Sequence, residues 1–292
     1  MAIWYPGEMA SLLLDSRLIT PVRFKKYSFK IVRCGDYLQV YYYNKPREIK
    51  DVEKLDIDNL KKKSRSVSSI PGKIEERNVI RTKLNCQRLA KANAKEWKSF
   101  ITLTYKECMQ DVKQAKKDLE YYVSNIKKVK KDFKYIAIPE FQTRGAIHFH
   151  LLTNLEHDSE FIPKRPKIRV YNKKKKIYRE IEYYNLKYWN KGFSDSEKVD
   201  GDIKKVVGYI SKYMTEDCDE RLFNFRRFSS SQNLEKPVTE FISMRDDHSR
   251  QWLIKQLEGK DLIYSNQYND VFNNSVEFKE FLSVNIIGHD AK

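Results

Sequence analysis

Two of the five histidines in this chain stand one residue apart, in the apolar segment Gly145-Ala-Ile-His-Phe-His-Leu-Leu152. Because side chains alternate between the two faces of a β-strand, His148 and His150 are expected to point the same way. If the chain turns near residues 143–144, His148 on the returning arm lies close to Glu140 on the outgoing arm, which adds a carboxylate. Two imidazoles and a carboxylate can hold a divalent ion, and by ligand type alone this ion is Zn, Mn, Fe or Ni. Three ligands leave positions open, which suits catalysis better than a structural role.

A second set of reactive side chains lies later in the chain. Tyr209, Lys212 and Tyr213 are spaced to share one face of an expected helix over residues 202–215. A tyrosine hydroxyl, with a pKa of about 10, is a poor nucleophile at neutral pH, but beside a lysine and a metal-polarised phosphate it can attack phosphorus. Tyr209 is favoured because Lys212 follows it by three residues, whereas Glu216 stands there after Tyr213. Taken alone, two tyrosines on an amphipathic helix are more simply explained as surface aromatics.

The composition points to a polyanionic partner. The net charge is +17, and the 292 residues include 19 tyrosines and 15 phenylalanines, on which bases can stack. The sequence contains no long uncharged apolar stretch, so no transmembrane helix is expected. The N-terminus lacks the charged start of a secretory signal, and the four cysteines are scattered along the chain. We therefore expect a cytoplasmic nucleic-acid-binding protein with reduced thiols and no membrane partner.

The stretch over residues 164–191 is the most basic part of the chain and has tyrosines interleaved with its lysines. Lysines neutralise phosphates and tyrosines stack on unpaired bases, although a solvated loop would have a similar composition. The residues expected to contact DNA, including one at the preceding turn, are Arg144, Arg169, Tyr171, Lys173, Lys174, Lys175 and Lys176.

Hydrophobic periodicity and turn residues predict the elements that position these side chains. Strands are expected over residues 27–32, 38–43, 100–105, 135–138 and 146–153, helices over 75–97, 111–131 and 200–216, a turn over 139–145, and two strand-like arms around 173–176. The order strand, helix, strand, turn, strand predicts an α+β fold with a central antiparallel sheet flanked by helices.

The expected elements divide the chain into three parts. Residues 1–74 are expected to be a β-rich extension whose charged end, 44–72, is a linker or an exposed helix end. Residues 75–240 form the expected catalytic domain, and residues 241–292 are an extension without functional signal.

Taken together, the motifs resemble those of the HUH endonucleases that initiate rolling-circle replication. That family has a strand like Phe100-Ile-Thr-Leu-Thr-Tyr105, then a His-hydrophobe-His strand, and then a helix with Tyr-x-x-Lys that in some members carries a second tyrosine. The resemblance is strongest to phage and plasmid initiators of the replication-associated gene II protein type. It covers about residues 75–240, including the segment 225–237 that trails the tyrosine helix.

The resemblance implies an HUH nuclease core, ferredoxin-like or RRM-like, and an enzyme that nicks and rejoins origin DNA, single-stranded or hairpin. His148 and His150 would hold Mg or Mn, with Glu140, or alternatively Gln142, as the third ligand. Tyr209 would form a 5′-phosphotyrosine intermediate, Lys212 would stabilise charge, and Tyr213 would be a second nucleophile.

A relaxase or transposase of the same superfamily is an alternative, although relaxases place the tyrosine before the histidines. A non-catalytic DNA- or RNA-binding protein is another. Since no G-x-x-x-x-G-K-[ST] motif occurs in the sequence, strand separation would need a partner helicase from the host, bacterial if the gene is carried by a phage or plasmid.

Overall fold

The structure is a computed structural model, and its backbone falls into two compact units. One unit comprises residues 70–235, and the other combines residues 1–69 with residues 236–292. The residues that the structure describes are 19–21, 26–48, 71–142, 144–163, 168–172, 176–181, 186–199, 203–213, 226–244, 251, 253–254, 257, 260–270 and 273–282.

The unit of residues 70–235 is built on a five-stranded sheet in the order β10-β5-β6-β4-β9, with every neighbouring pair antiparallel. The strands are β4 (Ser99–Thr104), β5 (Tyr135–Phe141), β6 (Ile147–Thr153), β9 (Ser194–Lys198) and β10 (Ser229–Ser230). Since β4 and β5 both run antiparallel to the β6 between them, they are parallel to each other. Helix α4 (Val112–Val129) makes the crossover between them.

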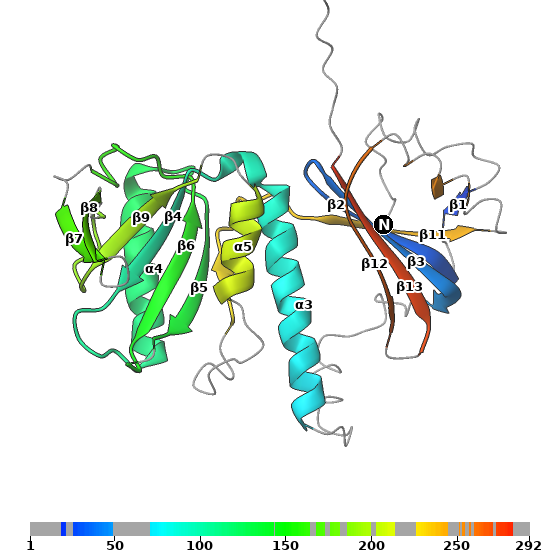
Figure 1. Cartoon of the computed structure of the whole chain (residues 1–292), viewed down its shortest axis with the longest axis horizontal. Coiled ribbons are helices and arrows are strands. Elements are labelled where there is room, and N and C mark those ends of the chain that lie inside the picture. The colour runs from blue at the N-terminus through cyan, green and yellow to red at the C-terminus, as the bar shows by residue number, and fades with distance from the viewer. Residues whose placement is uncertain are drawn as a thin grey trace, which may run out of the picture. The chain divides into compact units, whose positions relative to one another are not determined.

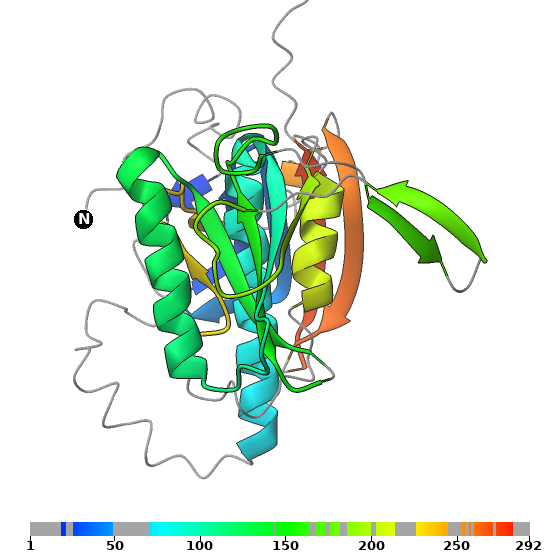
Figure 2. The same ribbon diagram turned by 90° about the vertical axis from the view of Figure 1, so that its left-hand side faces the viewer.

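Helices cover both faces of this sheet, as Figures 1 and 2 show. On one face, apolar residues of β4, β5 and β6 pack with the buried side of α4. On the other, they pack with α3 (Pro71–Ala92) and α5 (Ile203–Tyr213), and α5 contacts both β5 and α3. This arrangement confirms the predicted α+β class with a central antiparallel sheet flanked by helices.

Alternation along β6 decides which side chains face which layer. Ile147, Phe149 and Leu151 belong to the core beneath α4, so His148 and His150 emerge on the face that carries α5. All seven residues of β6 are buried, as expected for the central strand of the sheet.

Strand β5 is longer than predicted. The sequence predicted a strand over 135–138 and a turn from Pro139, but β5 continues to Phe141 and pairs Pro139 with Phe149. The neighbouring strand β10 pairs only with Ile136 and Ala137, so Pro139 lies beyond that pairing, where a missing N–H is tolerated. Glu140 therefore stands on a strand and not in a turn.

The helix predicted over 75–97 is also shifted. Helix α3 begins at Pro71, whose missing N–H costs nothing in a first turn, and ends at Ala92. The Asn93 side chain donates to the carbonyl oxygens of Leu89 and Glu235, and a short 3₁₀ helix, η2 (Ala94–Glu96), follows.

The second unit contains a six-stranded antiparallel sheet in the order β1-β11-β2-β3-β13-β12. Its strands are β1 (Ile19–Pro21), β2 (Lys26–Cys34), β3 (Tyr37–Glu48), β11 (Val238–Met244), β12 (Asp261–Asn269) and β13 (Ser275–Leu282). The β2–β3 hairpin turns at Gly35, whose φ of 59° is easy for glycine, as the sequence predicted.

The first and last parts of the chain therefore share one sheet, whereas the sequence predicted separate extensions over 1–74 and 241–292. Strand β3 also extends to Glu48, into the segment expected to be a linker. The shared sheet comes from strand pairing between distant segments, which no local pattern reveals. The extension of β3 comes from its hairpin partner, because Arg47 and Glu48 pair with Tyr27 and Lys26 of β2.

Two further strands, β7 (Ile168–Asn172) and β8 (Ile177–Ile181), form a two-stranded sheet and confirm the two predicted arms. Among the described residues, no helix is both long and apolar enough to cross a membrane.

Gly192 allows the segment before β9 to lie directly against the end of β4. The carbonyl oxygens of Lys191 and Phe193 accept hydrogen bonds from the amides of Lys106 and Thr104, at 3.0 and 2.8 Å. A Cβ atom on Gly192 would lie 2.3 Å from the Lys106 nitrogen and 2.4 Å from the Thr104 oxygen. Gly192→Ala should therefore lower the free energy of unfolding by about 1–3 kcal/mol, as overpacking does, measured by urea denaturation.

Gly208→Ala is the matched control for this prediction. A Cβ atom there would meet nothing within 4 Å, and alanine favours a helix over glycine by about 1 kcal/mol. The same substitution should therefore stabilise the protein at position 208. Equal effects at the two sites would contradict the close approach at Gly192.

Candidate functional site

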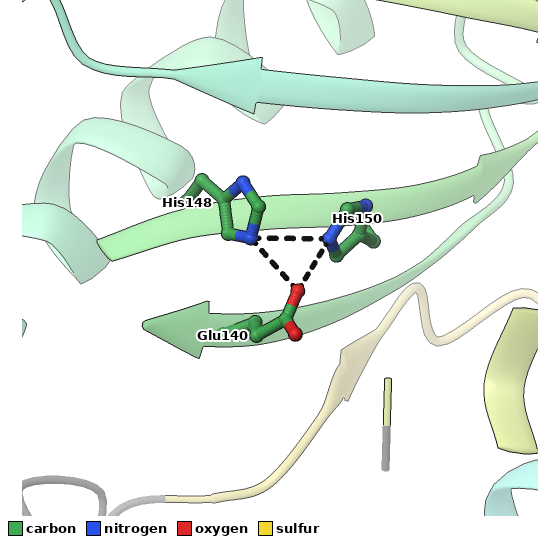
Figure 3. Close-up of side chains that lie close together, drawn as sticks. All are labelled: Glu140, His148 and His150. Atoms are coloured by element: carbon green, nitrogen blue, oxygen red, sulfur yellow. Dashed lines mark hydrogen bonds and ion pairs between the residues drawn. The ribbon is translucent and has the colours of Figure 1, made fainter. Parts of the chain in front are cut away.

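Three potential metal ligands converge on the face of the sheet that carries α5 (Figure 3). Register pairs Glu140 of β5 with His148 of β6, and His150 is the next residue of β6 on the same face. The Glu140 Oε2 atom lies 2.8 Å from His148 Nε2 and 2.9 Å from His150 Nε2, and the two nitrogens are 3.2 Å apart. The predicted triad is therefore present. Its ligand atoms lie close enough together to hold one metal ion.

The spacing of these three atoms fits a divalent ion. The separations of 2.8–3.2 Å between these three atoms are short enough for all of them to contact one ion through bonds of about 2.1 Å. Such an ion would keep further positions open to water or to substrate oxygens.

The two histidines are held differently. The Thr102 hydroxyl lies 3.2 Å from His150 Nδ1, and Thr102 pairs with His150 in the register of β4 and β6. A hydrogen bond at Nδ1 fixes the ring and leaves the Nε2 lone pair for a metal. The Nδ1 atom of His148, by contrast, is buried without a hydrogen-bond partner among the described residues.

Electrostatics keep two of the ligands in forms that bind metal. Burial raises the pKa of Glu140, but hydrogen bonds and charge from His148 and His150 outweigh it and lower the pKa to about 2. Burial lowers the pKa of His150, and the positive charges of His148 and Lys212 add to this effect against the opposing influence of Glu140. An ionised carboxylate and a neutral imidazole are the ligating forms.

Tyr209 of α5 lies over the same face of the sheet. Its ring stacks on Phe100 of β4, with centroids 4.1 Å apart and an interplanar angle of 15°. Phe100 in turn stacks on His150, at 5.6 Å and 13°. The Tyr209 hydroxyl donates a hydrogen bond to Glu197 of β9. One aromatic ring therefore links the nucleophile predicted from sequence to a predicted metal ligand.

The other predicted members of the tyrosine helix are placed less fully. Lys212 is exposed on α5, and its charge acts on His150. Tyr213 is the last residue of α5, but its side chain lies outside the described residues.

The predicted DNA contacts fall in two places. Arg144 is exposed at the turn between β5 and β6, where its guanidinium donates to Tyr105 O and Gln142 Oε1. At this turn the side chain of Gln142, the alternative third ligand, accepts the hydrogen bond from Arg144.

On the β7–β8 hairpin, Arg169 lies over the ring of Tyr178, which contacts Tyr171 at a centroid distance of 5.0 Å. Tyr171, Tyr178 and Lys176 are exposed. Lys173, Lys174 and Lys175 lie outside the described residues.

Sequence reasoning assigned no role to Phe100, Thr102 or Glu197. The alternation of Thr102 and Thr104 with apolar neighbours in β4 was a usable signal, because it places both hydroxyls on the face of the histidines. No such pattern pointed to Glu197, because the segment Ser194–Lys198 is polar throughout and its composition is typical of a loop.

The segment that carries the site matches a known protein family. Residues 98–218 match the family of the replication-associated proteins ORF2 and gene II protein, which confirms the resemblance expected from the sequence. The matched segment contains β4, the triad and α5. No curated protein and no solved structure matches the chain.

Thr102→Val should weaken binding of Mn²⁺ by about tenfold, because partners of a ligating imidazole typically contribute 10- to 100-fold to metal affinity. Titration followed by electron paramagnetic resonance measures this affinity directly. The physical cause is the loss of the hydroxyl that orients His150.

Thr104→Val provides the control. Thr104 lies on β4, as Thr102 does, and pairs with His148 of β6, but His148 Nδ1 has no hydrogen-bond partner among the described residues. Its Mn²⁺ affinity should equal that of the wild type. A similar loss in both variants would argue against a specific role for Thr102.

Proposed function

Because residues 98–218 match the replication-associated family of ORF2 and gene II protein, we propose that this chain initiates replication by nicking one strand of an origin and later rejoining it. The observation that carries the proposal is the common placement of Glu140, His148, His150 and Tyr209 on one face of one sheet. A nucleophile beside an open metal site is suited to transfer of a phosphodiester.

In the proposed reaction, the Tyr209 oxygen bonds to phosphorus and the 3′-oxygen of the scissile bond leaves. The 5′-phosphate stays on the protein as a phosphotyrosine ester, and the free 3′-hydroxyl primes synthesis. The reverse reaction rejoins the ends. Lys212, exposed on α5 near His150, offers a positive charge to the phosphate. Tyr213, on the same helix, is proposed as a second nucleophile.

The residues of the triad fit a divalent ion that, when bound, stabilises negative charge on the phosphate. We favour Mn over Mg, because Mg strongly prefers oxygen ligands and two of the three protein ligands are imidazole nitrogens.

DNA binding outside the cleavage site is assigned to the basic hairpin and to Arg144. The hairpin combines exposed Tyr171 and Tyr178 with Arg169 and the lysine run 173–176, a pairing of stacking surface and charge typical of single-strand binding. A host helicase is the proposed partner for strand separation.

The test of the nicking proposal is formation of a covalent adduct. Overlapping single-stranded oligonucleotides that tile both strands of the whole DNA molecule carrying the gene are incubated with the protein and Mn²⁺, and adducts are detected by denaturing electrophoresis. Wild-type protein should form an adduct with one tile, and EDTA should prevent it. Tyr209→Phe should abolish the adduct while leaving affinity for that tile within about twofold, because a single hydroxyl contributes little to phosphate-dominated binding.

Tyr213→Phe is the control, and it should still form the first adduct. If the adduct instead persists in Tyr209→Phe and is lost in Tyr213→Phe, the nucleophile is Tyr213. If the wild type binds DNA but forms no adduct with any tile, the chain is a non-catalytic DNA-binding protein.

The proposed role of the hairpin predicts a change in salt dependence. Replacing Lys173, Lys174, Lys175 and Lys176 by glutamine should reduce the slope of log Kd against log salt by about 0.7 for each single-strand phosphate that the protein no longer neutralises. Fluorescence anisotropy with a labelled oligonucleotide measures this slope.

The control removes the same charge from α4, on the opposite face of the sheet from the triad, through exposed residues Lys113, Lys116, Lys117 and Lys128. This variant should keep the wild-type slope within error. Equal reductions in both variants would mean that net charge alone, and not the hairpin, sets the salt dependence.

A further inference from the structure

The hydroxyl of Tyr209 is already paired with a carboxylate. Glu197 lies on β9, where register places it opposite Phe100, and its Oε2 atom accepts the hydrogen bond from Tyr209 Oη. The stacked ring of Phe100 sets the plane of the tyrosine, and Glu197 sets the direction of its O–H bond. Strands β4 and β9 together thus hold one reacting group of α5.

We propose that Glu197 is the general base for Tyr209, an inference that rests on the nicking function proposed above. As the Tyr209 oxygen bonds to phosphorus, its proton passes to Glu197 Oε2. The bond between phosphorus and the 3′-oxygen breaks, and the departing 3′-alkoxide takes a proton from water. In the rejoining direction, a 3′-hydroxyl gives its proton to water and its oxygen bonds to phosphorus. The bond between phosphorus and the Tyr209 oxygen breaks, and the protonated Glu197 returns its proton to that oxygen.

The chemistry requires such a group. A tyrosine with an ordinary pKa of about 10 is almost fully protonated at neutral pH, so its attack on phosphorus needs a proton acceptor within hydrogen-bond reach. Glu197 meets this geometric condition before substrate binds, and its exposed side chain can exchange the proton with solvent.

Three other charged groups on this side of the sheet, all among the described residues, do not serve as the base. Glu140 is held between His148 and His150 as a metal ligand. Asp195 stands two residues before Glu197, but its side chain accepts a hydrogen bond from the backbone amide of Ser196. Lys212 is cationic and cannot accept a proton. Glu197 is therefore the carboxylate placed to serve the hydroxyl.

The experiment separates a base from a purely structural partner by varying the acidity of the phenol. Four full-length proteins are compared in single-turnover adduct formation: wild type, Glu197→Gln, the wild type with trifluorotyrosine at position 209, and the combination. Trifluorotyrosine loses its proton more readily than tyrosine, so it depends less on a base. Metal affinity and DNA affinity are measured for each protein to show that the site remains folded.

With tyrosine at position 209, Glu197→Gln should slow adduct formation by about 100-fold or more, the usual contribution of a general base. With trifluorotyrosine, the same substitution should cost less than about tenfold, because less proton transfer is needed. Asp195→Asn, a matched neutralisation on the same strand, should leave the rate within about threefold of wild type, since it removes no base.

The proposal is overturned if Glu197→Gln changes the rate by less than about threefold, or if its penalty is equal for the two phenols, which would assign Glu197 a structural role. An adduct that survives Tyr209→Phe would instead refute the nucleophile assignment. Absence of any adduct in the wild type would refute the nicking function and this inference with it.

Discussion

The register of three neighbouring strands is the constraint on which the site depends. Strand β6 pairs on one side with β5 and on the other with β4, and these two ladders place Glu140 opposite His148 and Thr102 opposite His150. A shift by one residue in a β-strand moves every side chain to the other face. The imidazoles would then enter the core beneath α4, and Phe149 would take the place of the ligands. Packing of the α4 core therefore enforces the chemistry on the opposite face.

Phe100 joins the hydrophobic core to the site. It is buried in the core that α3 and α5 share with the sheet, and its ring also stacks with those of Tyr209 and His150. The position of α5 is thus coupled to the position of the ligands through one rigid side chain. Stacked aromatic pairs contribute about 0.5–1.5 kcal/mol beyond the area they bury, which is enough to favour one orientation of the tyrosine ring.

Much of the site was predictable because its parts are local, whereas the rest depends on distant pairing. The alternation of His148 and His150 and the hairpin that returns Glu140 each depend on a few neighbouring residues. Strand β9, by contrast, is polar and pairs with β4 from far along the chain, so Glu197 could not be foreseen beside Phe100. The six-stranded sheet has the same origin, because β2 and β3 pair with the distant β11 and β13. Apolar periodicity predicts that a strand buries one face, but it does not predict which other strand pairs with its edge.

The two-unit division has a consequence for synthesis of the protein. Residues 70–235 form one unit and interrupt the other, so the β2–β3 hairpin leaves the ribosome long before β11 and β13, its partners in the sheet. Domains generally fold as units during synthesis, and the continuous unit has all its strands available first. The nascent hairpin meanwhile exposes two unpaired edges, a condition that favours aggregation. Rapid translation of residues 70–235 would shorten this interval, because the six-stranded sheet is complete only after β13 has been made.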